Sequence, residues 1–456
     1  MKKIIFLPIE IKSRELIPKT LVSMFALKNN FSCFIGNKHG IFRATKHFSP
    51  GTYFYKSINH TDLNHIKKIK VLKNNYIVQD EEAGFTHSSI QDINKFITVR
   101  SSLKNVELID KFFTWGKFDH QQWVKRYSKY SHKFKLLGSP RMDLWKKNII
   151  NKVYENELKK IRNKYGSKIV LIISSFISSK KDFLDYNRTD QYWFKFRSDK
   201  EKRIQLNQRK SDRAFFKNYI KMIDYISKKN PKINFIIRPH PSENILDWFK
   251  ISKMFNKNVF VSNDYDASPW MQVSKFVIHN SSAAGLQTIG MNKKLITYKP
   301  SQFKYNRNFP NKFGILAKNK EKISKIIKGN GNFFTSKSDI KKLKYRLYDL
   351  NSNKLIAEKL VKIINKIHKV KSNASLTKIF FLSFLYKFRD LFFEQFIKIL
   401  RKKKRDDYSI RSSGEKIPGG IRKKELIQVF KAMNNFDKKV KIFQFCNNCF
   451  FVYKKN

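Results

Sequence analysis

The sequence predicts an α/β protein made of two similar halves, followed by a basic and helical C-terminal region. Short apolar runs alternate with amphipathic segments, and this alternation starts afresh near residue 166. Strands that alternate with helices are typical of parallel βαβ units. We therefore expect two Rossmann-like domains that face a cleft, over residues 1–165 and 166–330, and a third region over residues 331–456.

The first half contains apolar runs that are each short enough to form one strand, and residues 14–30 have the apolar spacing of a helix. The segments that contain these runs are KIIFLPI (3–9), FSCFIG (31–36), KIKVLKNNYIVQDEEAGF (68–85) with one or two strands of which the last ends at Asp80, VELIDKFFTWG (106–116) and KFKLLGSP (133–140).

The second half repeats this pattern, with an amphipathic helix over residues 215–229 and a polar, lysine-rich stretch over 177–212 that we expect to be a loop or lid. Ligands of doubly wound sheets bind beyond the carboxyl ends of the strands, so the site is expected there. The apolar runs are SKIVLIISSF (167–176), INFIIRPH (233–240), NVFVSN (258–263), SKFVIH (274–279) and KKLITY (293–298).

The chain is strongly basic. Its 456 residues include 96 Lys and Arg against 35 Asp and Glu, a formal charge of +61. Such a charge attracts nucleic acid, anionic lipid or anionic substrates. The lysines are spread along the whole chain, however, and a proteome rich in lysine and asparagine produces the same excess. An apolar content of 41% excludes a disordered protein.

The three cysteines, Cys33, Cys446 and Cys449, are too few and odd in number for a disulfide framework, and they fit a reducing cytoplasm. Cys446 and Cys449 form a single CxxC pair, without the second pair or the histidines that a zinc site needs. We therefore expect no metal site.

Membrane association is expected at the surface only. The apolar run at the N-terminus is too short for a signal peptide, and no window is apolar enough to span a bilayer. Aromatic and aliphatic residues recur at helical spacing over 375–400, and RKKKR follows at 401–405. A basic amphipathic helix is typical of binding to an anionic membrane, although a helix packed on the domains has the same pattern. The protein is thus predicted to be cytoplasmic and peripheral on the inner face of the membrane.

Three polar clusters follow predicted strands. In the first, Asp80, Glu81 and Glu82 precede Gly84. Crowded carboxylates raise one another's pKa, which suits a general base or a nucleophile. Acidic residues at a helix N-terminus give the same pattern, and the triplet alone favours that explanation.

The second cluster is RPHPSEN, residues 238–244. Arg238 and His240 could meet a phosphate, with Pro239 and Pro241 stiffening the turn. A surface turn is the other explanation. Glu243 is expected to support the following helix as an acid of its first turn, with Ser242 as the cap.

The third cluster follows a strand that ends at His279. Asn280, Ser281 and Ser282 then open a helix with small residues in its first turn. A helix N-terminus presents backbone N–H groups to an anion, although Asn and Ser are also ordinary caps.

Taken in order, these clusters resemble the motifs of bacterial sialyltransferase-type enzymes and of the related Kdo transferases of capsule and lipopolysaccharide assembly. The chain is also similar to surface carbohydrate biosynthesis proteins, over most of residues 1–420. The matching segments are PIEIKSREL (8–16), PGTYFYKS (50–57), DEEAG (80–84), FFTWG (112–116), GSPRMDLW (138–145), RPHPSEN (238–244), HNSSAAGLQTIG (279–290) and KIPG (416–419).

The resemblance implies a GT-B-like fold and metal-independent transfer of a sugar such as Kdo or a sialic-acid-like sugar. The implied donor is CMP- or UDP-linked, the implied acceptor is a polysaccharide or is lipid-linked, and no cofactor is implied. It assigns catalysis to one of Asp80, Glu81 or Glu82. Ala83 interrupts the stricter acidic motif, so the choice among them stays open. The implied donor-binding residues are Arg238, His240, Pro241, His279, Asn280, Ser281, Ser282, Gln287 and Ser174.

Gln287 stands where related enzymes often carry a ribose-binding Glu. Lys12 and Arg14 follow the first strand and are expected either to bind an anionic acceptor or to lie in a solvated loop.

Two other functions remain open from the sequence. A polyol-phosphate transferase or a non-hydrolysing nucleotide-sugar epimerase would use the same fold. A basic nucleic-acid-binding protein would explain the charge, but no recognisable nucleic-acid motif is present, so no specific nucleic-acid partner is expected.

Overall fold

The computed structural model describes residues 3–81, 86–176, 199–240, 243–300, 309–329, 337–350, 352–368, 370–400, 417, 419–434 and 438–455, with part of α9 and the end of α16 as backbone only. These residues form two compact units. The first contains residues up to Val153 and from Lys344 onwards, and the second contains Tyr154–Leu343 together with Thr86–Ser88.

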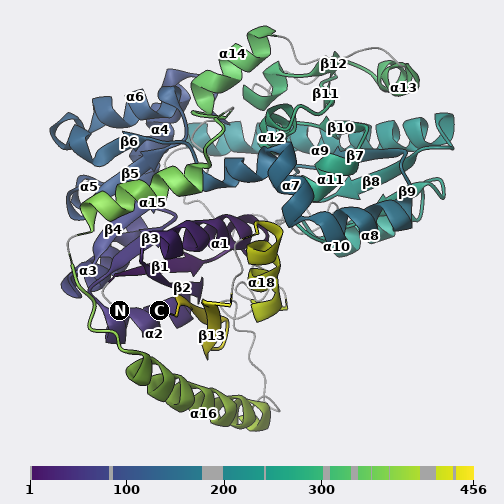
Figure 1. Ribbon diagram of the computed structural model, residues 1–456. Helices are drawn as coiled ribbons and strands as arrows, with labels where there is room; N and C mark the ends of the chain where they lie inside the picture. Colours follow the sequence, from purple (N-terminus) through teal and green to yellow (C-terminus); the bar gives the residue numbers. More distant parts are fainter. Residues whose placement is uncertain are drawn as a thin grey trace. The chain divides into compact units, whose positions relative to one another are not determined.

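The first unit is built on a sheet of eight strands in the order β13-β14-β2-β1-β3-β4-β5-β6 (Figure 1). The six strands from β2 to β6 are parallel. Every residue of β1 is buried, as expected for a strand covered on both faces. The strands are β1 (Ile4–Ile9), β2 (Ser32–Asn37), β3 (Thr52–Tyr55), β4 (Asn75–Gln79), β5 (Lys111–Thr114), β6 (Phe134–Leu136), β13 (Val440–Cys446) and β14 (Cys449–Lys454).

Helices cover this sheet, and side-chain caps define where several of them begin. Asn37 caps α2 by accepting from the N–H of Gly40 (2.7 Å), and Ser89 and Ser102 cap α4 and α5. The helices are α1 (Lys12–Lys28), α2 (Lys38–Phe48), η1 (His60–Asp62), α3 (Leu63–Val71), α4 (Ile90–Arg100), α5 (Leu103–Leu108), α6 (Lys117–Arg126), η3 (Ser128–Lys133), η4 (Pro140–Trp145), α7 (Lys147–Val153), α15 (Ile356–Ile367), α16 (Leu376–Leu400) and α18 (Lys423–Ala432); α14 (Lys337–Arg346) crosses the division between the units.

The second unit has a sheet of six parallel strands in the order β12-β11-β10-β7-β8-β9. The chain winds outward from β7 in both directions, which is the doubly wound order with its switch point between β7 and β10. The elements are α8 (Glu155–Tyr165), β7 (Ile169–Ile173), α9 (Asp199–Lys229), β8 (Asn234–Arg238), α10 (Ile245–Ser252), β9 (Val259–Val261), α11 (Ala267–Val273), β10 (Phe276–His279), α12 (Ala284–Gly290), β11 (Leu295–Tyr298), η7 (Phe309–Lys312), β12 (Ile315–Ala317) and α13 (Lys320–Lys328).

Two expectations about secondary structure were wrong. The C-terminal region is not helical throughout, because β13 and β14 form a hairpin whose second strand pairs antiparallel with β2. Residues 199–212 are helical and belong to α9, so the expected loop over 177–212 ends earlier; its part over 177–198 lies outside the described residues. The division of the chain into three regions, with borders at residues 165 and 330, stays a prediction. The chain from Lys344 onwards belongs to the first unit.

Candidate functional site

The second unit gathers most of the predicted donor-binding residues at the carboxyl ends of its three central strands. Ile173 is in register with both His279 and Arg238, so the residues after β7, β8 and β10 are neighbours. Ser174 continues this contact, because its N–H donates to the carbonyl of Arg238 (3.2 Å). Pro241 lies outside the described residues.

Glu243 connects these loops. Its carboxylate accepts from the Ser174 hydroxyl, from the backbone N–H of Phe176 (2.6 Å) and from the indole N–H of Trp248 (2.7 Å). Burial raises the pKa of Glu243, and the three hydrogen bonds work against that rise. The expected cap Ser242 is not described, and the side chain of Asn244 caps α10 instead. Ser174 is buried and its hydroxyl is already used, so it supports the loop.

Arg238 holds the loop between β9 and α11. Its guanidinium donates to the carbonyls of Asp264 (2.8 Å) and Tyr265 (2.5 Å). Burial lowers its pKa to about 10, which leaves it charged at neutral pH. His240 is half-buried, and its carbonyl accepts from the N–H of Glu243 (2.8 Å). The end of β8 therefore places a cation, Arg238, and a histidine, His240, two residues apart.

His279 does not lie on the surface as expected for a donor-binding residue. Its ring is fully buried beneath Gly285, and its Nε2 atom is 2.9 Å from the Thr297 hydroxyl. That hydroxyl donates to a main-chain carbonyl, so Nε2 of His279 carries the proton and donates. Burial lowers the pKa of His279 to about 3, and the ring is therefore neutral. The His279 ring packs directly against Gly285 and so supports the first turn of α12.

The residues after His279 form a tight turn. Asn280 is buried, and its Oδ1 atom has no hydrogen-bond partner within the described part of the chain. Ser281 adopts a positive φ of 51°, and its backbone N–H donates to the side chain of Asn311 (2.8 Å). The Ser282 hydroxyl accepts from the N–H of Ala284 (3.2 Å). The turn is thus held in one conformation by side chains.

Gln287 is committed to a structural contact. Its amide donates to the hydroxyl of Ser268 (2.8 Å), and Asp266 accepts from that hydroxyl (2.8 Å). Asp266 also accepts from the hydroxyl of Tyr154 (2.5 Å). A network of four side chains therefore joins α12 to the beginning of α11.

Gly285→Ala is expected to destabilise the second unit, because the added Cβ would lie 2.5 Å from Cε1 of the buried His279 ring. Overpacking of this kind costs about 1–3 kcal/mol, only partly offset by about 1 kcal/mol of helix propensity. Urea unfolding measures the difference. Gly329→Ala is the control, since its added Cβ has its nearest neighbour at 3.3 Å. Equal stability of Gly285→Ala and the unsubstituted protein would contradict this packing.

The first unit has its own charged network at the carboxyl ends of its strands. Glu10, after β1, is paired with Lys38 (2.7 Å) and with Lys56 (2.9 Å), which follows β3. Burial opposes the charge of Glu10, but the two lysines outweigh it and hold its pKa well below its ordinary value. The backbone N–H of Glu81 donates to the carbonyl of Lys56 (3.1 Å), which joins β4 to this network.

Two of the three predicted catalytic carboxylates lie at this edge. Asp80 is buried and paired with Arg100 (3.4 Å), and Glu81 is buried and paired with Arg141 (3.2 Å). Burial raises the pKa of Glu81, against the opposing charge of Arg141. The residues that follow them, 82–85, lie outside the described part of the chain, so the capping explanation of the triplet stays open. Glu82 lies outside the described residues.

Lys12 and Arg14 lie in the first turn of α1, not in a solvated loop. The Lys12 ammonium is paired with Glu425 (2.8 Å) of α18. Arg14 lies 3.7 Å from Glu15, a buried residue that also pairs with Lys19 (2.9 Å). Binding of an acceptor by Lys12 or Arg14 stays a prediction.

Sequence reasoning missed the residues that position Asp80. The indole N–H of Trp115 donates to the carbonyl of Asp80 (2.5 Å). Asp119 accepts from the backbone N–H groups of Trp115 (3.0 Å) and Gly116 (2.7 Å), and burial raises its pKa to about 7. The motif FFTWG contains Trp115 and Gly116, so the sequence marked this segment among the matching motifs. It gave no indication that Trp115 contacts Asp80 or that Asp119 accepts from both residues.

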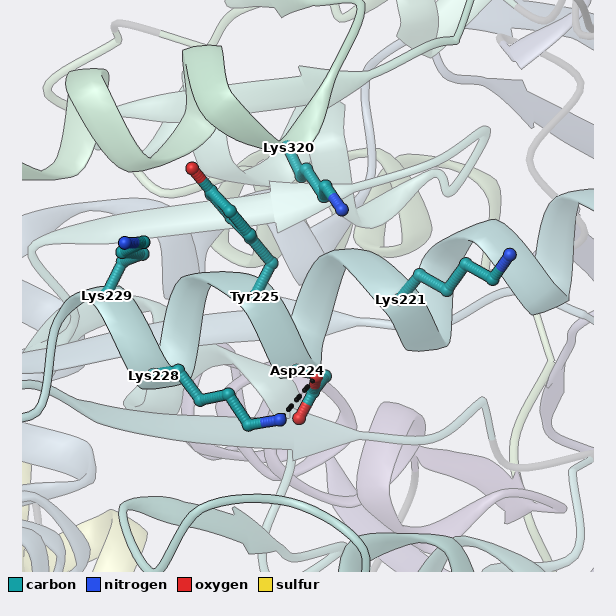
Figure 2. A pocket seen from close by; sticks show the side chains of 6 residues that line it. All are labelled: Lys221, Asp224, Tyr225, Lys228, Lys229 and Lys320. Atoms are coloured by element: carbon teal, nitrogen blue, oxygen red, sulfur yellow. Dashed lines mark hydrogen bonds and ion pairs between the residues drawn. The ribbon is translucent and has the colours of Figure 1, made fainter.

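A basic hollow of about 380 Å³ lies elsewhere in the second unit, between α9 and α13 (Figure 2). None of the predicted site residues lines it. Lys228 is paired with Asp224 (2.9 Å), and the ammonium of Lys320 lies over the ring of Tyr225 (4.8 Å). The lining residues are Lys221, Asp224, Tyr225, Lys228, Lys229 and Lys320. No group of three or more His, Cys, Asp or Glu in the described ranges is arranged to hold a metal ion.

Comparison with protein families finds no match, and comparison with curated proteins finds none. Among solved structures, the wall teichoic acid polymerase TagF is similar over 80% of this chain and 89% of its own, with 12% identity and a TM-score of 0.51. UDP-GlcNAc 2-epimerase from Methanocaldococcus jannaschii, in complex with UDP-GlcNAc and UDP, gives 14% identity over 80% and 100% of the chains and a TM-score of 0.48. The S. aureus MnaA–UDP structure gives 11% identity over 80% and 96%, with a TM-score of 0.48.

At such low identity, the similarity to TagF establishes the fold and nothing more. The chain has two Rossmann-like domains of the GT-B type, as the sequence predicted. That the two domains face a cleft stays a prediction.

Proposed function

We propose that the protein is a glycosyltransferase of surface-polysaccharide synthesis, which transfers a sugar from a nucleotide-linked donor to a polysaccharide or lipid-linked acceptor. The observation that carries the proposal is the switch point between β7 and β10. Doubly wound sheets bind nucleotides at this position, beyond the carboxyl ends of the strands. The residues after β8 and β10 there, with Arg238, His240 and Ser281, are of the types that bind phosphate.

When the sugar is transferred, the nucleotide leaves through its phosphate group. The main task of the site is therefore to stabilise the negative charge that develops on the phosphate oxygens. In the proposed mechanism, His240 donates to a phosphate oxygen, and Arg238 contributes a fixed positive charge. The hydroxyl groups of Ser281 and Ser282, which accept hydrogen bonds in this turn, donate their protons to the same anion. Glu243 acts at one remove, because it holds the loop that carries His240.

The acceptor hydroxyl needs a base, and the proposal assigns this role to one of the carboxylates at 80–82. Glu81 is suited to it, since burial raises its pKa towards the range in which a carboxylate accepts a proton efficiently. Arg141 orients it through the contact at 3.2 Å. Kdo or a sialic-acid-like sugar as the transferred group belongs to the proposal and rests on the sequence motifs.

Nucleotide binding provides the first test, through a thermal-shift screen of CMP, CDP and UDP and of sugars linked to them. A nucleotide present at about 100 times its dissociation constant stabilises the folded state by about 2.7 kcal/mol, which raises the melting temperature by about 5–10 °C. Stabilisation by CMP over UDP would identify the donor class. His240→Ala should remove the shift, and His132→Ala, an exposed histidine of the first unit, should retain it. Absence of any nucleotide shift would overturn the proposal.

The catalytic assignment has a separate test. Of Asp80→Asn, Glu81→Gln and Glu82→Gln, one variant should lower turnover by about 100-fold while its nucleotide shift stays unchanged, because a general base acts in the chemical step. Normal turnover in all three would remove the acidic cluster from the mechanism.

Polyol-phosphate transfer is the second candidate, because an enzyme for that reaction would use the same two-domain fold, which this chain shares with the wall teichoic acid polymerase TagF. Product analysis separates the two reactions, since a polyol-phosphate transferase moves a phosphate with the polyol and a glycosyltransferase moves the sugar alone. A product formed without any acceptor would indicate an epimerase.

A further inference from the structure

Helix α16 presents a row of exposed aromatic side chains along one face. Phe381 is 62% exposed, Phe384 68%, Phe388 56% and Phe392 59%. Their spacing of three or four residues places them on one side of the helix. Contiguous exposed apolar patches of this kind mark interaction surfaces, whereas single exposed apolar residues are ordinary.

The opposite face of α16 anchors the helix to the first unit. Ile379 is fully buried, and the hydroxyl of Ser383 donates to a main-chain carbonyl of β13 (3.1 Å). One guanidinium nitrogen of Arg43 in α2 donates to both carboxylate oxygens of Asp390 (3.0 Å each), and the Tyr386 ring lies beside the same guanidinium. Helix α16 packs against β13 (Figure 1). Its contacts with β13 and α2 fix the rotation of the helix, and the exposed aromatic row lies on the side away from these contacts.

Positive charge borders the aromatic row. Lys378, Lys387 and Arg389 lie on the flanks of α16, and RKKKR follows the helix at 401–405. Residues 375–405 contain nine Lys and Arg against two Asp and Glu. None of the helices within the described ranges is long and apolar enough to cross a membrane.

We propose that α16 lies in the plane of an anionic phospholipid surface, with Phe381, Phe384 and Phe388 inserted at the level of the headgroups. Aromatic side chains on one face and basic residues beside them are the combination that interfacial helices use. Lysine and arginine close to an anionic leaflet add electrostatic attraction. A second copy of this chain is a poor occupant, because two chains with a formal charge of +61 repel each other.

Membrane binding through α16 is a property separate from the proposed transfer reaction, and it does not depend on the nucleotide site. Lipid-linked acceptors are held at the same surface, so membrane binding through α16 would keep the protein close to them. Vesicle binding needs no nucleotide, however, and nucleotide binding needs no vesicle. Failure of one measurement therefore leaves the other intact.

Co-sedimentation of the full chain with vesicles tests the proposal. We expect binding to an equal mixture of phosphatidylglycerol and phosphatidylcholine, weaker binding to phosphatidylcholine alone, and a decrease at high salt. Phe381→Ser/Phe384→Ser/Phe388→Ser should raise the apparent dissociation constant by about 30-fold, because the inserted apolar area is lost. The variant should fold normally, since these side chains are exposed.

A matched control uses exposed apolar residues elsewhere, in the variant Val71→Ser/Leu103→Ser/Met254→Ser. This control should bind vesicles as the unsubstituted protein does. Hydrogen exchange in α16 should slow when mixed vesicles are added and stay unchanged in the Phe variant. Equal binding of the Phe variant, or no binding of the unsubstituted protein, would overturn the proposal. A change in oligomeric state caused by the Phe substitutions, with vesicle binding unchanged, would assign the face to a second copy instead.

Discussion

Glu243→Ala is expected to lower the free energy of unfolding of the second unit by about 4 kcal/mol and to abolish the nucleotide shift. The substitution leaves two buried donors without an acceptor, the backbone N–H of Phe176 and the indole N–H of Trp248. Each buried donor left without a partner costs about 1–3 kcal/mol. Nucleotide binding is lost as well, because the loop that carries His240 is no longer tied to the end of β7.

Urea unfolding followed by tryptophan fluorescence measures the first effect, and the thermal-shift screen measures the second. Glu243→Gln keeps the shape of the side chain and one acceptor oxygen, so its loss of stability should be roughly half as large. Glu321→Ala is the control, since Glu321 is an exposed acid of α13 in the same unit. If Glu243→Ala unfolds at the same urea concentration as the control, Glu243 does not hold these loops together.

The fold class could be predicted because the apolar runs are short, regular and separated by amphipathic segments. Strands such as β1 and β7 are buried at every position, which makes them visible as continuous apolar runs. Strand order within each sheet is not encoded in this way. The sequence of residues 440–454 does not show that β14 pairs with β2. This pairing requires a free edge on β2, a strand that lies more than 400 residues earlier in the chain.

The sequence predicts which residues belong to the candidate site, but it does not predict the contacts that these residues make with one another. The position of Glu243 before an apolar helical segment predicts an acid of a first helical turn, whereas its carboxylate reaches back to the segment that follows β7. In the same way, Asp143 of the motif GSPRMDLW accepts from the backbone N–H groups of Ile356 (2.8 Å) and Ala357 (2.9 Å) at the start of α15. Partners this distant in sequence are found only when the chain is folded.

His279 shows a different limit of prediction. As a histidine at the end of a strand beside serines, it fits a ligand-binding residue, and only its burial distinguishes a supporting role. That burial produces the second large expected effect, a loss of stability of the second unit in acid. Burial lowers the pKa of His279 from its ordinary value of 6.5 to about 3.

Below pH 6.5 the unfolded chain takes up a proton on His279 that the folded chain does not accept until about pH 3. The unfolded state then binds more protons, so the free energy of unfolding falls as the pH falls. The stabilising contribution is complete above pH 6.5 and is lost at about 1.4 kcal/mol per pH unit through this window. Between pH 6.5 and pH 4.5 the expected loss is therefore about 2.5 kcal/mol.

Hydrogen exchange of peptides from residues 276–298 measures this loss within the second unit. A local readout is required, because burial also lowers the pKa of His65 and of His368, each to about 4, and both lie in the first unit. His279→Gln removes the titrating group while its amide replaces the hydrogen bond to Thr297, so the acid dependence in these peptides should flatten. His132→Gln, at an exposed position, should leave it unchanged. An undiminished acid dependence in His279→Gln would show that another group in the second unit causes it.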